Sequence, residues 1–244
     1  MSKKVLVIGD SCRDIFVYCS ANRLCPDVPV PVLNILNKTE NVGMAKNLQR
    51  NIASLGAECD IATNFNWQRY TKTRYIHNES NHMFIRIDSG EEDVQKCDVS
   101  KLFLGYDLIA ISDYDKGFLK EEDVEYICNK HNNVFLDSKK TLGEWASNCK
   151  FIKINQEEFN KSKNKMPKGL FDKIIYTKGS GGCSFQGEVF PVEKVEVKDT
   201  SGAGDSFFAG LIFNYLMTDD IFSAIRFANE CGSKVVKSKG VVSV

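Results

Sequence analysis

The chain of 244 residues is 43% hydrophobic and 26% charged, a composition typical of a globular protein that buries a substantial core. Its 32 basic and 32 acidic residues give a formal net charge of zero, so no overall field attracts nucleic acid or an anionic membrane, and we expect neither as a partner. The apolar run at residues 5–8 is too short for a secretion signal, and the most apolar stretch, 207–217, is shorter than the ~20 residues that cross a bilayer. We therefore expect a cytoplasmic protein.

The first half of the chain predicts one buried strand, one helix and a group of covering strands. Residues 5–8 form a β-branched run that ends in Gly9-Asp10, which is typical of a buried parallel strand opening into a functional loop. Apolar residues at spacings of three and four over 42–55, with Gly56 just beyond, indicate an amphipathic helix. The remaining predicted strands are 59–63, the lid or edge strands 15–18 and 28–35, the second containing Pro29 and Pro31, and a hairpin of 73–77 with 83–88.

The second half alternates strands with helices. Short apolar runs predict strands at 108–111, 134–136, 151–154 and 174–176, and residues 121–130 predict a helix between the first two. Such alternation specifies a parallel sheet covered on both faces, because each parallel pair needs a crossover connection. Two amphipathic helices follow, one beginning near Ser206 and one spanning about 221–236.

The segment 199–205, Asp-Thr-Ser-Gly-Ala-Gly-Asp, stands directly before a predicted helix. Its glycines let backbone amides approach a ligand, and the positive end of the helix dipole favours a phosphoryl group there. Asp205 beside such a turn would repel the anion unless it has a task, such as removing a proton from an attacking hydroxyl. The alternative is that Asp199 or Asp205 only caps the helix.

Two other nucleotide-binding patterns are excluded. Gly202-x-Gly204 could begin a dinucleotide fingerprint, but Phe207 occupies the third glycine position. No G-x-x-x-x-G-K-[ST] sequence occurs, so a Walker-type phosphate loop is absent and any nucleotide must be held differently.

The chain resembles, from end to end, the ribokinase-like or PfkB family of carbohydrate kinases. The segment Asp199-Thr200-x-Gly202-Ala203-Gly204-Asp205 matches the carboxy-terminal signature of that family. Within the family, the chain looks most similar to the heptose-7-phosphate kinase domain of bifunctional heptose kinase/adenylyltransferases. Five further segments carry this resemblance: Val7-x-Gly9-Asp10-x-x-x-Asp14, residues 23–32 with their three prolines, residues 51–57, Ile85-Arg86-x-Asp88, and Asp113-Tyr114-x-Lys116-Gly117.

The resemblance implies a fold and a reaction. The fold would be a three-layer α/β/α sandwich with a mostly parallel central sheet and a small β-strand lid, in one sugar-kinase domain over residues 1–244 with lid segments near 12–36 and 71–89. The reaction would transfer the γ-phosphoryl group of ATP, with Mg²⁺, to a hydroxyl of a sugar or sugar phosphate, the first expectation being position 1 of a heptose 7-phosphate. A homodimer through the lid is also implied.

The resemblance also implies roles for single residues. Asp205 would deprotonate the acceptor hydroxyl, and an anion hole would be formed by Gly202, Ala203 and Gly204. Glu158, in the motif Asn155-x-x-Glu158, would organise magnesium through water, which suits a hard, oxygen-seeking cation. The other implied contacts are those to the sugar or its phosphate (Asp14, Gly43, Asn47, Arg86 and Lys116) and those to the nucleotide (Asn155, Thr177, Gly179, Gly182 and Asn229).

Several of these residues also have an ordinary structural interpretation. Asn155 and Glu158 have the spacing of a capping box at a helix start. Gly179 and Gly182 could simply turn a hairpin, and Arg86 and Lys116 could be solvated surface charges.

The chain departs from the family pattern in two ways. Met44 replaces the second of two adjacent glycines after Gly43, which puts a side chain where the backbone should meet the sugar. The chain is also short, with elements apparently missing between Asn64 and Lys72 and after Glu158. Two alternatives therefore stay open: a catalytically weakened binding relative, or a kinase of the same fold acting on a nucleoside or an unphosphorylated sugar.

Overall fold

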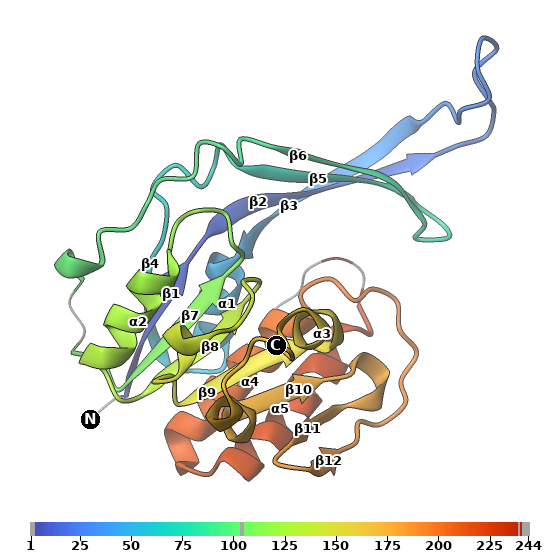
Figure 1. Ribbon diagram of the computed structural model, residues 1–244. Helices are drawn as coiled ribbons and strands as arrows, with labels where there is room; N and C mark the ends of the chain where they lie inside the picture. The colour runs from blue at the N-terminus through green and yellow to red at the C-terminus, as the bar shows by residue number, and fades with distance from the viewer. Residues whose placement is uncertain (1–2, 103–104, 239, 241–244) are drawn as a thin grey trace.

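The computed structural model describes residues 3–102, 105–238 and 240, and its body is built on an eight-stranded sheet (Figure 1). The strand order is β12-β11-β10-β9-β8-β7-β1-β4, parallel from β4 to β10 and antiparallel for the last two strands. The strands are β1 (Lys4–Gly9), β4 (Glu58–Ala62), β7 (Leu108–Asp113), β8 (Val134–Ser138), β9 (Phe151–Asn155), β10 (Ile174–Thr177), β11 (Cys183–Phe185) and β12 (Glu188–Phe190).

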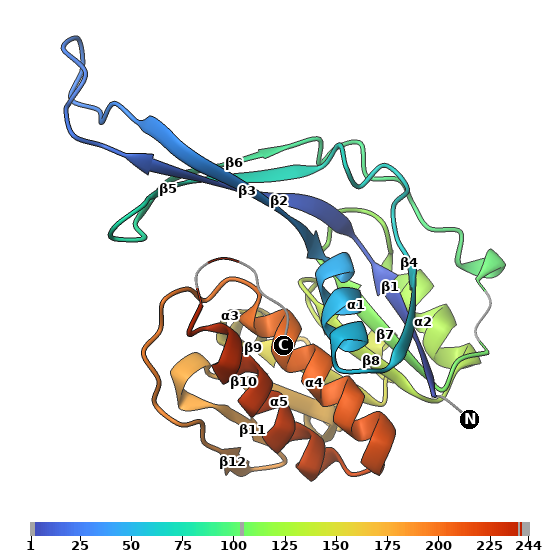
Figure 2. The same ribbon diagram turned by 180° about the vertical axis from the view of Figure 1, so that it is seen from behind.

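Helices cover both faces of this sheet. Val5 and Val7 of β1 pack in one apolar core with α1 (Ala45–Ser54), α4 (Ala203–Thr218) and α5 (Ile221–Val235), and Figure 2 shows these three helices together on that face. Leu6 and Ile8 point to the opposite core, which α2 (Glu121–Lys130) and the region of α3 (Gln156–Ser162) cover. Alternate side chains of one strand thus serve two cores, as a sheet buried on both faces requires. The expected three-layer α/β/α architecture with a mostly parallel sheet is confirmed. Short 3₁₀ turns lie at Val99–Lys101, Glu144–Ala146, Lys168–Lys173 and Gly179–Gly181.

A second sheet of four strands forms a lid above the body (Figures 1 and 2). Its order is β3-β2-β5-β6, with β2 (Ser11–Ser20), β3 (Asn34–Met44), β5 (Thr71–His77) and β6 (Met83–Ser89). β2 follows β1 after Asp10 alone, and β3 leads directly into α1, so the lid is tied to the body at the carboxyl end of β1. The expected hairpin of β5 and β6 is confirmed.

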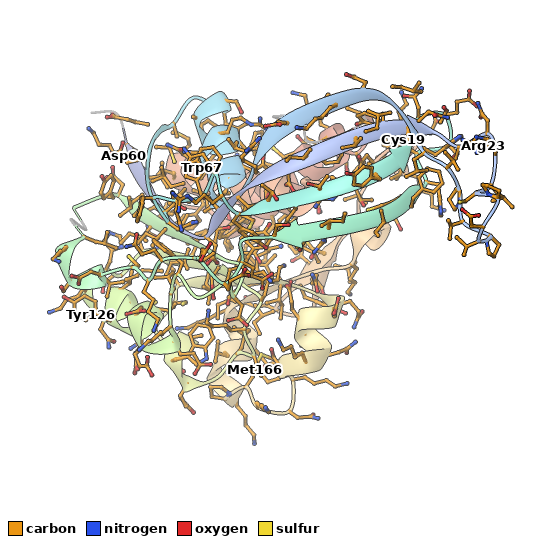
Figure 3. All side chains as sticks on the ribbon, turned by 90° about the horizontal axis from the view of Figure 1, so that it is seen from above. Cys19, Arg23, Asp60, Trp67, Tyr126 and Met166 are labelled. Carbon is orange, nitrogen blue, oxygen red and sulfur yellow. The ribbon has the colours of Figure 1, made fainter. Side chains whose placement is uncertain are left out.

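The prediction for residues 28–35 is wrong. Residues 28–33 lie in a loop whose strand-like pairing is a single bridge between Leu24 and Pro31, and only the last two residues of the predicted strand belong to β3, which begins at Asn34. Proline lacks a backbone donor, so Pro29 and Pro31 weaken any ladder in this segment. Figure 3 shows the loop projecting beyond the lid, with Cys19 at its base and Arg23 near its far end.

Two helix starts also differ from prediction. Val42 lies in β3 and the first helix begins at Ala45, because the strand keeps pairing with β2 up to Met44. The helix expected near Ser206 begins at Ala203. Among the described residues, no helix is long and apolar enough to cross a bilayer. The carboxyl ends of β1, β7, β8 and β9 share one edge of the body sheet, below the lid, and this edge carries the residues described next.

Candidate active site

Asp205 lies in the first turn of α4 and is 7% exposed. Its Oδ2 accepts a hydrogen bond from Asn47 Nδ2 at 2.7 Å, and its Oδ1 accepts one from Tyr114 Oη at 2.8 Å. Burial raises the pKa of Asp205 above its usual value, while the two donors work against that rise because they stabilise the charged form. The carboxylate is therefore held at the junction of α1, α4 and the loop after β7.

The turn before α4 has the free donors of an anion site. Gly202 is the N-cap residue, with φ 80°, and no side chain caps the helix. The amides of Gly204 and Asp205 donate no hydrogen bond within the described chain, whereas Ala203 N donates to Thr200 O. The capping alternative is wrong for both aspartates, because Asp205 binds side chains and Asp199 accepts from the amides of Ser201 and Gly240. Two N–H groups and the positive helix end thus remain available beside Asp205.

A buried ion pair lies directly behind this turn. Lys153 Nζ is 2.7 Å from Asp137 Oδ2, and a Cβ built on Gly204 would come within 3.3 Å of the same ammonium. Burial works to raise the pKa of Asp137, but Lys153 and then Lys139 outweigh it, and the pKa lies below the usual value. Sequence reasoning missed these three residues. A lysine inside the apolar strand Phe151–Asn155 was the signal that could have found Lys153.

Asn155 and Glu158 form a capping box at the start of α3. Asn155 Oδ1 accepts from the Glu158 amide at 2.9 Å, and Glu158 Oε2 accepts from the Asn155 amide at 2.8 Å. Glu158 also pairs with Lys139, so its carboxylate already has several protein partners. The structural interpretation of this motif as a capping box is confirmed. Lys139 also contacts the Asp137 carboxylate, so this lysine links Glu158 with Asp137.

The inner side of the lid supplies the residues expected at the sugar. Asp14 on β2 is 9% exposed and pairs with Arg74 on β5 at 2.6 Å. Gly43 pairs with Cys12 in the strand register and lies against the Asp14 carboxylate, which a Cβ at Gly43 would approach to 2.7 Å. Met44 adopts φ 61° and buries its side chain with Cys12 and Tyr70. The side chain that replaces the glycine therefore packs into an apolar cluster under the lid.

Arg86 and Lys116, expected at the phosphate of the sugar, both have carboxylate partners. Arg86 pairs with Asp88 at 2.7 Å, and Lys116 pairs with Glu91 at 2.5 Å. Asp10 accepts hydrogen bonds from the amides of Tyr114 and Phe118 and so fixes the loop that carries Lys116 and Tyr114. The structure thus places both cations near the lid, each already neutralised.

Of the residues expected at the nucleotide, Asn155 lies in the capping box of α3, and the others lie in or near a cleft at β12 and α5. A cleft of about 750 Å³ is lined by Asn229 and by residues 188–193, among others, and Asn229 Nδ2 donates to Phe190 O at 3.1 Å. Thr177, Gly179 and Gly182 form the turn between β10 and β11 and do not line this cleft themselves. Gly182 adjoins it, since a Cβ there would come within 2.1 Å of Phe190 O.

Comparison with known proteins decides the family. The sequence pattern described as pfkB family carbohydrate kinase matches residues 66–244, which is well over half of the chain. The chain belongs to the pfkB family of carbohydrate kinases. Enzymes of this family are phosphotransferases whose acceptor is a hydroxyl group, and the resemblance noted in the sequence is confirmed at this level.

Curated relatives and solved structures agree with this family. The bifunctional protein HldE of Helicobacter pylori (strain J99 / ATCC 700824) is 28% identical over 294 positions, and HldE of Campylobacter jejuni (strain RM1221) is 28% identical over 295, covering 98% and 99% of this chain. The chain spans 64% and 62% of their lengths. The nucleoside kinase of Methanocaldococcus jannaschii, described as an archaeal member of the ribokinase family, superposes with a TM-score of 0.73 at 17% identity, covering 99% of this chain and 94% of that one. The ribokinase of Thermotoga maritima gives 0.74 at 15%, covering 97% and 94%, so the fold is ribokinase-like.

Proposed function

We propose that this pfkB-family chain transfers the γ-phosphoryl group of ATP to a hydroxyl of a sugar phosphate, with the 1-hydroxyl of a heptose 7-phosphate as the first candidate. The observation that carries the proposal is the Asp205 carboxylate, buried beside the unpartnered amides of Gly204 and Asp205. A buried base next to free donors is what in-line transfer to a hydroxyl needs.

The reaction is a single displacement at the γ-phosphorus. The acceptor hydroxyl binds Asp205 and takes the place of Asn47 or Tyr114 as a partner of one carboxylate oxygen. As the new oxygen–phosphorus bond forms, the proton passes to Asp205, and the bond to the leaving phosphate breaks with its electron pair going to ADP. The free amides of Gly204 and Asp205 and the helix dipole stabilise the charge on the equatorial oxygens, whereas the Ala203 amide, expected in the anion hole, is already bound to Thr200 O.

ATP would lie between this turn and the cleft near Asn229. Mg²⁺ would supply electrostatic stabilisation of the phosphates. The described residues hold no cluster of three His, Cys, Asp or Glu side chains that could bind a metal ion. Magnesium in proteins usually keeps several waters and is bound through one or two carboxylates. Glu158 is the expected group, and the neighbouring Asp137 Oδ1, buried without a hydrogen-bond donor, is a second available oxygen.

The choice of a heptose phosphate is supported by the sequence motifs shared with heptose-7-phosphate kinase domains and by the similarity to HldE. Because ATP is the phosphoryl donor, we place this activity in the cytoplasm and assign it to residues 1–244 as one domain.

The assay is a phosphoryl-acceptor screen with ATP and magnesium. Heptose 7-phosphates of both anomers, the unphosphorylated heptose, ribose, fructose 6-phosphate and a nucleoside are compared by ADP release and product mass. A heptose bisphosphate as the preferred product supports the proposal. Preference for the nucleoside or ribose supports the alternative acceptors, and no product with any acceptor supports a weakened binding relative.

We further propose that the outer face of the lid binds a second copy of the chain. Ile85 and Ile87 of β6 are 52% and 45% exposed and lie opposite Tyr75 and Thr73 in the β5 register. An apolar stripe on a sheet face of this kind is typical of a self-complementary interface. Light scattering should give twice the chain mass, and Ile85→Glu should give the monomer mass.

A further inference from the structure

Two lysines in the described chain are more than nine-tenths buried, and they differ in their partners. Lys153 is 4% exposed and pairs with Asp137 at 2.7 Å. Lys72 is 7% exposed, and its ammonium donates to the thioether of Met44 at 3.2 Å. No carboxylate oxygen of the residues that the structure describes lies within 4.0 Å of Lys72 Nζ. Lys72 is thus a buried cation without an anion.

The strands on either side of Lys72 carry carboxylates, but these form ion pairs with arginines. In the register of the sheet, Lys72 on β5 lies between Asp14 on β2 and Asp88 on β6. Asp14 pairs with Arg74 at 2.6 Å, and Asp88 forms two hydrogen bonds with Arg86, at 2.8 and 2.7 Å. All five side chains belong to one face of the lid, because successive residues of a strand alternate between faces. That face has three cations and two carboxylates, and the unmatched charge is on Lys72.

The surroundings of Lys72 place its ammonium at the acceptor site. It lies 5.4 Å from the ring centre of Tyr70 and 5.0 Å from that of Tyr114. Tyr114 donates to Asp205, the proposed base, so one aromatic ring links the two groups. Tyr70 Oη is also buried and makes no hydrogen bond. Two polar groups with unused bonding capacity therefore lie together beside Tyr114.

A buried ammonium needs more than these neighbours provide. Lys72 has three N–H donors, and a thioether is a weak acceptor, while ring faces contribute only about 0.5–2 kcal/mol each. A desolvated charge is normally paired, because its burial costs several kcal/mol. We propose that the missing partner is the ligand, and that Lys72 Nζ binds the phosphate monoester of the acceptor sugar. This inference rests on the proposed kinase function and names the residue that recognises the charge of its substrate.

The inference differs from the expectation for Arg86 and Lys116. Each of those cations is neutralised by an acid of the protein, at 2.7 and 2.5 Å, so binding a phosphate there would first require breaking an ion pair. Lys72 has no such pair to break.

Calorimetric binding without nucleotide tests the assignment. The ligands are heptose 7-phosphate, the same heptose without phosphate, and inorganic phosphate, each titrated into the wild type, Lys72→Met and Lys72→Arg. Lys38→Met is the matched control, since Lys38 lies on the same lid but is half exposed and pairs with Glu40. We expect Lys72→Met to weaken both phosphate ligands by about 10- to 100-fold and to leave the unphosphorylated heptose within about twofold. Lys72→Arg should recover part of the loss, and Lys38→Met should match the wild type.

Two results would overturn the assignment. An equal loss for phosphorylated and unphosphorylated heptose would mean that Lys72 binds a hydroxyl or shapes the lid. No loss for any ligand would mean that the phosphate binds elsewhere. Unchanged ATP affinity of Lys72→Met shows that the variant is folded.

The binding test is independent of turnover. If Lys72→Met loses inorganic phosphate while the wild type phosphorylates no heptose phosphate, the anion site stands and the proposed substrate fails. A sugar acid in the same titration separates a site for phosphate from a site for carboxylate. Tight binding of the sugar acid with weak binding of phosphate would be a third result against the phosphate monoester.

Discussion

The body sheet and the lid sheet differ in how far their apolar residues are buried and in whether their buried charges are paired. All six residues of β7 in the body are buried, and the buried lysine of the same sheet, Lys153 on β9, has its own aspartate. In the lid, most of β6 is exposed, and the buried lysine Lys72 has none. The body therefore satisfies its apolar surface and its charges within the chain. The lid leaves an apolar outer face and an unpaired inner cation, which is what a surface needs if a ligand and a partner are to complete it.

The substitution Asp205→Asn tests the candidate base, which lies where the body meets the lid. Of the substitutions considered, it should have the largest effect on activity. The amide cannot accept the proton of the acceptor hydroxyl, so we expect kcat to fall by about 100- to 10,000-fold. The substituted amide can still bond with one of the two donors that the carboxylate has now, so ATP affinity should stay within a few-fold. Steady-state ADP release and calorimetric ATP binding measure the two quantities, and a variant that keeps a third or more of wild-type turnover would exclude Asp205 as the base.

The two buried lysines compare body and lid directly. Lys153→Met removes the closest partner of Asp137, and Lys139 at 3.9 Å compensates the buried carboxylate only in part, so the free energy of unfolding should fall by about 3 kcal/mol. Lys72→Met removes a cation that has no anion to leave behind, so the free energy of unfolding should stay equal or rise. Urea unfolding without ligand gives both values. Equal destabilisation by the two substitutions would contradict the contrast between the sheets.

Much of the body could be predicted from the sequence, because its strands are continuous apolar runs and its helices have clear apolar spacing. The signature at 199–205 also predicted the candidate base and the candidate anion turn, since that chemistry would depend on neighbouring residues. Lys72 was missed because its meaning arises from pairing with β2, a strand far away in the chain, and Asp137, Lys139 and Lys153 were missed because their ion pairs form only once β8 and β9 lie side by side. The extent of β3 was missed because its residues are mostly exposed and polar, so they show neither the apolar alternation of a strand nor the apolar spacing of a helix.

Asp10 joins the two sheets, and its ionisation should make that junction pH-dependent. Burial, and then the charge of Asp113, raise the pKa of Asp10 from 3.8 to about 6. The folded state thus binds this proton more tightly than the unfolded state, so the contribution of Asp10 to stability decreases as pH rises from about 4 to 6 and is constant outside that window. We expect a change of about 3 kcal/mol from this group. The check is the difference in unfolding free energy between wild type and Asp10→Asn at half-unit steps, which should vary across this window and stay flat from pH 6.5 to 8. A flat difference from pH 4 to 6 would exclude the raised pKa.

Met44 lies where the last strand of the lid passes into the body, and it sets backbone strain against side-chain packing. Its φ of 61° and ψ of −132° are favourable for glycine alone, at a cost of about 1–3 kcal/mol for other residues. Its side chain is 3% exposed and packs with Cys12 and Tyr70, and burying a methionine contributes about 1.5–3 kcal/mol. Met44→Ala loses the packing and keeps the strain, whereas Met44→Gly loses the packing and relieves the strain.

The glycine variant should therefore be more stable than the alanine variant, by about 1 kcal/mol or more in the free energy of unfolding. This is the reverse of the usual order, in which glycine is the less stable of the two residues in a folded element. Urea unfolding of the two variants measures the difference. If Met44→Ala is the more stable variant, the backbone conformation at the lid junction is not strained, and the methionine is there for its packing and for its contact with Lys72 alone. If glycine is more stable, the protein retains a strained backbone in exchange for a side chain that lines the buried ammonium, which ties the departure from the family pattern to the charge of the acceptor.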